Sequence, residues 1–167
     1  MNRIETALQA LQEKKEKAFI TYITAGLPDY DKTKAIIKAQ EAAGTDIIEL
    51  GIPFSDPVAD GPVIQAASYE AILGGANLEK TFTCMKEMRD DGVQIPVVFM
   101  MYYNTVLHYG VEKICKRVQC LRGGWTDHSG SAAGRAGRTP DTVTERGWNH
   151  SDPAGFPGIQ RPCAKNP

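Results

Sequence analysis

Two acidic residues that lie close together in the sequence, Glu49 and Asp60, are the side chains best suited to chemistry. Glu49 follows the apolar pair Ile47-Ile48 and precedes Leu50, so it is expected at the end of a short buried strand. Partial desolvation at such a position would suit its carboxyl group for proton transfer near neutral pH. A polar strand end that simply meets water is the alternative, and the pattern alone does not decide between the two.

Asp60 ends the loop that follows this strand, just before Pro62 begins a helix. An acid at this place is stabilised by the positive end of the helix dipole by about 0.3–1 kcal/mol, and spacing alone favours this structural role. The functional alternative is a second carboxylate that the loop brings over the strand end, since two acids in different environments can divide acid and base roles. Asp56, in the same loop, is expected to face solvent or a partner.

Strands alternate with helices through the first part of the chain. Apolar runs predict strands at 19–23, 46–50 and 96–101. Helical spacing and cap residues, among them Asp29 or Asp31 and then Asn77, predict helices at 31–43, 62–73, 78–91 and 111–117. Near-continuous apolar strands separated by helices are typical of a parallel sheet covered on both faces. The expected fold class is therefore α/β: a partial (β/α)8 TIM barrel of about three units, with a doubly wound sheet as the alternative.

The predicted helix at 31–43 needs one apolar side to cover the sheet. Ile36, Ala39 and Ala43 recur at helical spacing and are expected to form that side, with Ile37 at its edge. At the N-terminus, Ile4, Leu8 and Leu11 fit one face of a further helix.

The chain changes character near residue 117. Residues 1–117 contain 10 Lys and 3 Arg, whereas residues 118–167 contain 1 Lys and 5 Arg, together with 8 of the 16 Gly and 5 of the 10 Pro. The few large apolar residues of the second segment follow neither a period of 2 nor of 3.6, so it would bury too little apolar surface to offset its ordering entropy. We therefore expect a domain at 1–117 and a tail at 118–167 without regular structure.

The tail has the features of an out-of-frame translation. Val118 to Trp125 can be encoded GTG CAG TGC CTG CGG GGT GGA TGG, and the same bases read one nucleotide later give Cys-Ser-Ala-Cys-Gly-Val-Asp-Gly. Extending the shifted reading through Gly134 permits Leu-Ile-Ile-Pro-Asp-Leu-Pro-Leu-Glu. This string contains the apolar run that a buried parallel strand needs. One extra nucleotide near codon 117 is therefore expected.

The composition argues against several classes of protein. A formal charge of -1 gives no reason to expect nucleic acid or an anionic membrane as partner, and no run of 18 apolar residues could span a membrane. The N-terminus lacks the apolar core of a signal peptide, so the cytoplasm is the default compartment. The four cysteines form no CxxC or Cys/His pattern, and we expect no metal site. A single Arg-Gly-Gly triplet, without repeats or interleaved aromatic residues, is weak support for RNA binding.

Three motifs resemble those of the tryptophan synthase α chain family. Residues 48–61 (IELGIPFSDPVADG) are similar to the family signature. Residues 24–28 (TAGLP) resemble the TAGxP turn after its first strand, and residues 101–104 (MYYN) resemble the MYxN segment after its third strand. The order and separations agree as well. The resemblance covers residues 1–117, which is under half of a family member, and it implies a TIM barrel.

The resemblance implies a carbon–carbon lyase of tryptophan biosynthesis, an aromatic amino-acid pathway. Members of the family split indole-3-glycerol phosphate into indole and glyceraldehyde 3-phosphate by retro-aldol chemistry. On the matching positions, Glu49 would move protons at the glycerol side chain and at indole C3, and Asp60 would hold the indole N–H. Tyr22, Met100 and Tyr102 fall on positions that line the indole pocket. Tyr22 departs from the phenylalanine common there, and its hydroxyl needs a partner.

The resemblance also implies a protein partner, because Pro53, Asp56 and Asn104 fall on positions that meet the tryptophan synthase β subunit in an α2β2 assembly. Pyridoxal phosphate belongs to that subunit, so no cofactor is expected in this chain. The family grips the substrate phosphate late in the barrel, and no counterpart is found here, so we expect this polypeptide to be inactive. A fragment that binds the β subunit without catalysis is the alternative. The acid pair argues against another phosphate-binding barrel, such as a ribulose-phosphate epimerase relative.

Overall fold

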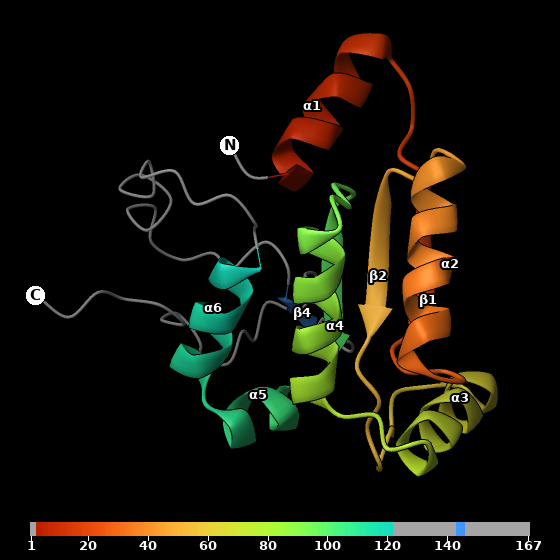
Figure 1. Ribbon diagram of the computed structural model, residues 1–167, viewed down its shortest axis with the longest axis vertical. Coiled ribbons are helices and arrows are strands. Elements are labelled where there is room, and N and C mark those ends of the chain that lie inside the picture. Colours follow the sequence, from red (N-terminus) through yellow and green to blue (C-terminus); the bar gives the residue numbers. More distant parts are fainter. Residues whose placement is uncertain (1–2, 122–142, 146–167) are drawn as a thin grey trace, which may run out of the picture.

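The computed structural model describes residues 3–121 and 143–145 (Figure 1). The elements follow in the order α1 (Arg3–Lys14), β1 (Ile20–Thr24), α2 (Tyr30–Ala42), β2 (Ile47–Gly51), α3 (Pro62–Leu73), α4 (Leu78–Asp90), β3 (Val97–Met101), α5 (Tyr103–Tyr109), α6 (Val111–Cys120) and β4 (Val143–Glu145). The four strands form one parallel sheet in the order β1-β2-β3-β4. The α/β class and the three predicted strand–helix units are confirmed.

The hydrophobic core lies between the sheet and the helices α2, α4 and α6. Ile48 and Leu50 of β2 are fully buried there, and the ring of Phe82 on α4 meets Phe99 of β3 edge to face at 5.6 Å. In Figure 1, α2 and α4 run side by side across the sheet. The β2 arrow points toward α3, so the carboxyl ends of the strands lie at the end of the molecule that carries α3 and α5.

Short polar contacts fix the beginnings of two helices and join α2 to α4. The Asp29 side chain accepts a hydrogen bond from the amide of Lys32 at 2.7 Å, and Asn77 accepts one from the amide of Lys80 at 3.0 Å, so these two predicted N-caps are confirmed. Between the helices, ion pairs join Lys34 to Glu87 at 3.0 Å and Lys38 to Asp91 at 2.7 Å.

The predicted apolar side of α2 was wrong by one position. Ile37 is fully buried, whereas Ile36 is 39% exposed and both Ala39 and Ala43 face solvent. The buried stripe instead contains Thr33, whose hydroxyl donates to the Asp29 carbonyl at 2.8 Å and accepts from the amide of Gly26 at 3.0 Å. Because both hydrogen-bonding functions of the threonine are satisfied, it can take a core position that apolar periodicity does not reveal.

Three further features differ from the sequence-based expectations. Helix α5 was not predicted, and α6 continues to Cys120, past the expected boundary at residue 117. The three residues of β4 pair with β3, although no regular structure was expected in the tail. A strand edge presents N–H and carbonyl groups that can pair with another strand, and β3 has such an edge on the side away from β2. The β-branched residues Val143 and Thr144 favour a strand conformation there. The remainder of the predicted tail lies outside the described residues.

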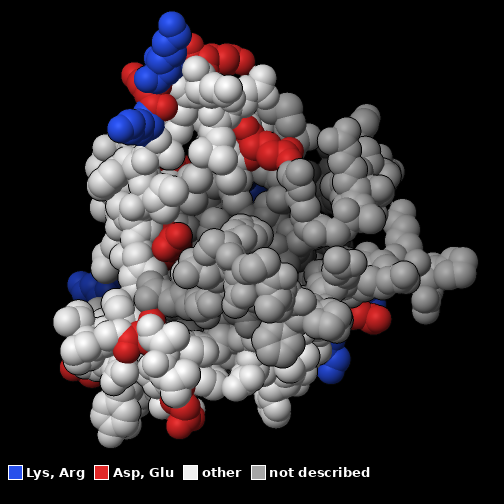
Figure 2. Space-filling view, turned by 180° about the vertical axis from the view of Figure 1, so that it is seen from behind, with Lys and Arg blue, Asp and Glu red and all other residues white. Residues whose placement is uncertain are grey.

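Figure 2 shows the side of the molecule opposite α2 and α4, where carboxylates are scattered and the described lysine and arginine side chains lie at the periphery. Among residues 3–121 and 143–145, no helix is long and apolar enough to cross a membrane.

Candidate active site

The register of the sheet gathers the predicted strand residues on one face. Tyr22 of β1 is the neighbour of Glu49 on β2, and Gly51 of β2 is the neighbour of Met100 on β3. Side chains alternate between the faces of a strand, and register neighbours in a parallel sheet share a face. Since Ile48 and Leu50 point into the core under the helices, the side chains of Tyr22, Glu49 and Met100 belong to the opposite face, which is the inner face of a barrel.

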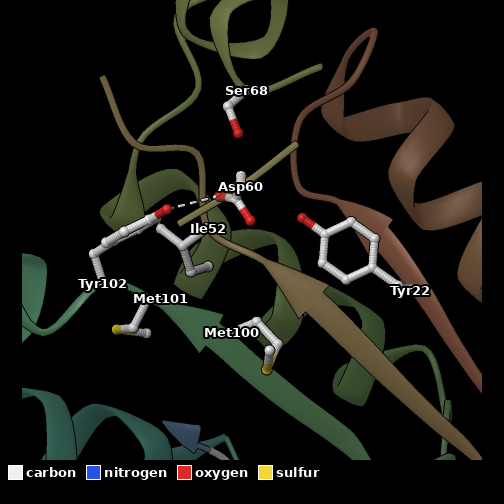
Figure 3. A pocket seen from close by; sticks show the side chains of 7 residues that line it. All are labelled: Tyr22, Ile52, Asp60, Ser68, Met100, Met101 and Tyr102. Atoms are coloured by element: carbon white, nitrogen blue, oxygen red, sulfur yellow. Dashed lines mark hydrogen bonds between the residues drawn. The ribbon is translucent and has the colours of Figure 1, made fainter. Parts of the chain in front are cut away.

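Gly51 makes room for Tyr22 at the carboxyl end of the sheet. A Cβ atom on Gly51 would lie 2.0 Å from the Tyr22 hydroxyl oxygen and 2.6 Å from its Cζ. The glycine therefore allows the ring of Tyr22 to cross above β2. In Figure 3 the hydroxyl of this ring points toward the carboxylate of Asp60.

The loop at 52–61 brings Asp60 to the carboxyl ends of the strands, where it lines a pocket with Tyr22 and Met100. The Tyr102 hydroxyl donates to Asp60 Oδ2 at 3.0 Å and accepts from the amide of Ala59 at 3.0 Å. The Tyr102 ring stacks on Phe54, with ring centroids 4.8 Å apart and planes 21° from parallel. One side chain that follows β3 therefore contacts the loop near its beginning and at its end.

These side chains surround a small pocket at the carboxyl end of the sheet (Figure 3). Four residues of the predicted site line it, namely Tyr22, Asp60, Met100 and Tyr102, together with Ile52, Ser68 and Met101, which were not predicted. The side chain of Ser68, a buried residue of α3, points toward Asp60. A polar residue on the buried stripe of an apolar helix was the only sequence signal for it. Aromatic faces, a thioether and a few polar groups suit a planar ring that carries a polar atom.

Glu49 lies near this pocket but is not among the residues that line it. It is half-buried on β2, two positions before Gly51, and has Tyr22 and Val98 as its neighbours on the two adjacent strands. The two acids therefore occupy different settings: Glu49 is held on a strand of the inner face, and Asp60 is held on a loop by Tyr102.

The three predicted partner-binding residues lie on the surface around the same end of the sheet. Asp56 is exposed and accepts a hydrogen bond from the Ser55 hydroxyl at 2.6 Å. Asn104 is exposed on α5, which directly follows β3, and Pro53 is half-buried in the loop that carries Asp60. All three are thus near Asp60 or Tyr102 in sequence, and none of them lines the pocket.

The cysteines and other metal-binding residue types show no clustering in the part of the chain that the structure describes. Among residues 3–121 and 143–145, no three His, Cys, Asp or Glu side chains come together as metal ligands would. Burial of the Cys84 side chain raises the pKa of its thiol to about 11, which disfavours the thiolate that metals bind.

The close approach of Tyr22 to Gly51 leads to a stability prediction. Gly51→Ala should lower the free energy of unfolding by about 1–3 kcal/mol, the range for overpacking at a buried site. In a Tyr22→Ala background the same change should be nearly neutral or stabilising, because the clash is gone and alanine is favoured over glycine within a strand. Urea unfolding of the four chains measures both values. An equal cost in the two backgrounds would show that the ring of Tyr22 is not what requires a glycine.

Parallel strands in sequence order, joined by helices and with the candidate residues at their carboxyl ends, have the arrangement of the first section of a TIM-barrel enzyme. Residues 8–121 match the family model described as tryptophan synthase alpha chain. The chain belongs to this family.

Individual relatives agree with the family match. The chain is 62% identical over 124 residues to the tryptophan synthase alpha chain of Lachnospira eligens, a stretch that covers 74% of this chain and 46% of the relative. It is 54% identical over 119 residues to that of Alkaliphilus metalliredigens, covering 71% of this chain and 44% of the relative. The crystal structure of tryptophan synthase subunit alpha from Legionella pneumophila superimposes with a TM-score of 0.71 at 33% identity, covering 74% of this chain and 47% of that structure. The chain thus spans less than half the length of these relatives.

Proposed function

We propose that residues 1–121 supply the acid–base part of a lyase site that cleaves indole-3-glycerol phosphate to indole and glyceraldehyde 3-phosphate. The observation that carries the proposal is the placement of the Asp60 carboxylate, which Tyr102 holds over the carboxyl ends of the strands while Glu49 lies on the same inner face. Two carboxylates in different environments suit a reaction in which one group moves protons and the other stabilises a developing positive charge. The family to which the chain belongs supports the same chemistry.

In this reaction the bond between indole C3 and the glycerol side chain breaks, the adjacent hydroxyl loses its proton, and indole C3 gains one. We assign both proton transfers to Glu49. The electron pair of the breaking bond moves into the indole ring while the ring nitrogen carries positive charge, and the Asp60 carboxylate stabilises that charge by accepting the N–H. Charge stabilisation by a fixed group costs little reorganisation, which is the reason such groups accelerate reactions.

The pocket residues suit the indole ring. The aromatic rings of Tyr22 and Tyr102 offer flat apolar surfaces on two sides of Asp60, and Met100 adds a thioether from the sheet (Figure 3). We propose that these three side chains bind the ring and place its N–H toward Asp60.

We also propose, from the family to which the chain belongs, that this chain binds a tryptophan synthase β subunit. Pro53 and Asp56 lie in the loop after β2 and Asn104 lies on α5, which follows β3, and we assign these three residues to contact with the β subunit, which receives indole in the family. Pyridoxal phosphate chemistry belongs to that subunit, so this chain works without a cofactor of its own. The cytoplasm is the proposed compartment.

The roles of the two acids are tested in a chimera. Residues 1–121 of this chain are joined to the remaining part of the Lachnospira eligens α chain, its 62% identical relative. Glu49→Gln and Asp60→Asn should each lower the turnover of indole-3-glycerol phosphate at least about a hundredfold, the scale of a lost acid–base group for Glu49 and of a lost charge-stabilising group for Asp60. Glu70→Gln and Asp31→Asn, which change exposed carboxylates on α3 and α2, are the matched controls and should keep normal turnover. Near-normal turnover in either Glu49→Gln or Asp60→Asn would remove that residue from the mechanism.

A further inference from the structure

Gln65, a residue of α3 outside the acid pair and the pocket lining, contacts the backbone of the loop at 52–61. Its side-chain Nε2 donates to the carbonyl of Asp60 at 2.9 Å and, with a longer bond of 3.4 Å, to the carbonyl of Pro57. The amide of Gln65 donates to the carbonyl of Gly61 at 3.0 Å. A glutamine amide carries two N–H hydrogens, so one side chain can serve both carbonyl groups.

Tyr102 contacts the same end of the loop through its hydroxyl group. Its hydroxyl accepts from the amide of Ala59 and donates its single hydrogen to Asp60. The direction of both hydrogen bonds is thereby fixed: Asp60 must act as the acceptor through its carboxylate. Gln65 thus restrains Asp60 at its carbonyl oxygen, and Tyr102 restrains it at its carboxylate oxygen.

We propose that Gln65 is a positioning residue for Asp60, which acts by fixing the backbone of the loop so that the carboxylate meets the Tyr102 hydroxyl. This inference rests on the catalytic role proposed for Asp60. A carboxylate that is restrained before the substrate arrives loses less conformational entropy on binding, and such preorganisation is a large part of catalytic power. The backbone contact also explains why a glutamine occupies a mostly exposed position in the first turns of α3.

The competing role for Gln65 is structural. Gly61, the N-cap of α3, makes no side-chain capping bond, so the side-chain amide of Gln65 could simply stabilise the beginning of the helix. In that case Gln65→Ala would lower the stability of α3 without changing the hydrogen bond between Asp60 and Tyr102. A test must therefore observe that hydrogen bond directly.

The experiment uses NMR of the isotope-labelled 167-residue chain and two readouts. The first is the exchange rate of the Ala59 amide, which the Tyr102 hydroxyl protects. The second is the 13Cζ resonance of Tyr102, which depends on the hydrogen bond to Asp60, with Asp60→Asn as the reference for its loss. Gln65→Ala should speed exchange at Ala59 about tenfold, the effect of losing the net stabilisation of one hydrogen bond. It should also move the Tyr102 resonance toward its position in Asp60→Asn.

Two variants complete the design. Gln65→Glu keeps the length of the side chain but replaces the donor with an acceptor, so it should behave like Gln65→Ala, and it serves if the alanine variant fails to fold. Gln9→Ala is the matched control, because Gln9 is an exposed helical glutamine that hydrogen-bonds Glu13 at 3.2 Å. Gln9→Ala should leave both readouts unchanged.

The proposal is overturned if the Tyr102 resonance stays in place in both Gln65 variants. It is also overturned if the amide of Ile52, which donates to the Met100 carbonyl at 2.8 Å outside the proposed contact, loses protection as much as Ala59 does. Neither readout involves the lyase reaction. Failure of the positioning role therefore leaves the turnover of the chimera unaffected, and failure of the lyase proposal leaves the NMR result intact.

Discussion

Indole-3-glycerol phosphate is expected to remain intact when it is incubated with the 167-residue chain alone. The chain carries Glu49 and Asp60, but the part that matches the family ends at residue 121 and the described barrel strands before that point are β1, β2 and β3. In TIM-barrel enzymes a phosphate group is frequently bound by the loops that follow strands 7 and 8. Without such a site the substrate is not held against the two acids, and orientation alone can supply about 7–11 kcal/mol of a reaction barrier.

The measurement is indole release against a control without enzyme, with the chimera described above as the positive control. Release by the 167-residue chain at more than the background rate would contradict the prediction. Adding a tryptophan synthase β subunit separates the two remaining possibilities for this polypeptide. A complex that forms without indole release supports a fragment that only binds its partner, through the surface near Pro53, Asp56 and Asn104. A complex that releases indole would instead show that the partner restores the missing grip on the substrate.

The sheet was predictable from the sequence because its strands are buried on the side of the helices. The observed strands begin and end within one residue of the predicted ones, since a run such as Val97–Met101 is apolar throughout and is bounded by polar or turn-forming residues. The N-caps were predictable for a similar reason. Asp29 and Asn77 have short acceptor side chains, and each acts through a contact only three residues away.

The features that were missed depend on contacts that the apolar pattern of the sequence does not encode. Thr33 is a core residue of α2 only because Gly26 and Asp29 satisfy its hydroxyl, and this moves the buried stripe onto Ile37. Helix α5 has aromatic and β-branched residues with weak helix propensity, and the core fixes it through Val106, which is buried. Local sequence carries little information about either feature.

The candidate site was also only partly predictable from the sequence. The sequence placed Asp60 at the end of a loop but favoured a purely structural role, and only the contact with Tyr102, 42 positions later, shows where the carboxylate is held. Ser68 and Gln65 gave almost no signal, because a single serine or glutamine on a helix has no periodicity of its own. Motif resemblance named the candidate residues, and the fold was needed to show which of them meet.

The second large effect concerns the gene. We propose that one extra nucleotide precedes the tail, and we expect the DNA that follows, read one position later, to encode Gly-Val-Asp-Gly-Leu-Ile-Ile-Pro-Asp-Leu-Pro-Leu-Glu and then a further part of the barrel. The motive is the change from lysine to arginine after residue 117, together with the end of the family match at residue 121. An apolar run at this place would supply the fourth parallel strand, and it would take the position beside β3 that β4 occupies here.

Codon degeneracy explains part of the match between the shifted reading frame and a barrel strand. Most codons between Arg122 and Gly134 leave one base undetermined, and each such base was chosen to suit the shifted frame. Trp125 has only one possible codon, TGG, so no base was chosen there. In the shifted frame its last two bases still begin the codon of the second glycine of Gly-Val-Asp-Gly. Sequencing the DNA from codon 117 to codon 134 decides the matter. Deleting the extra base should then yield a longer protein that releases indole from indole-3-glycerol phosphate, whereas the unaltered gene product should not. If the shifted frame meets a stop codon or lacks the apolar strand, the frame change is excluded and the tail has another origin.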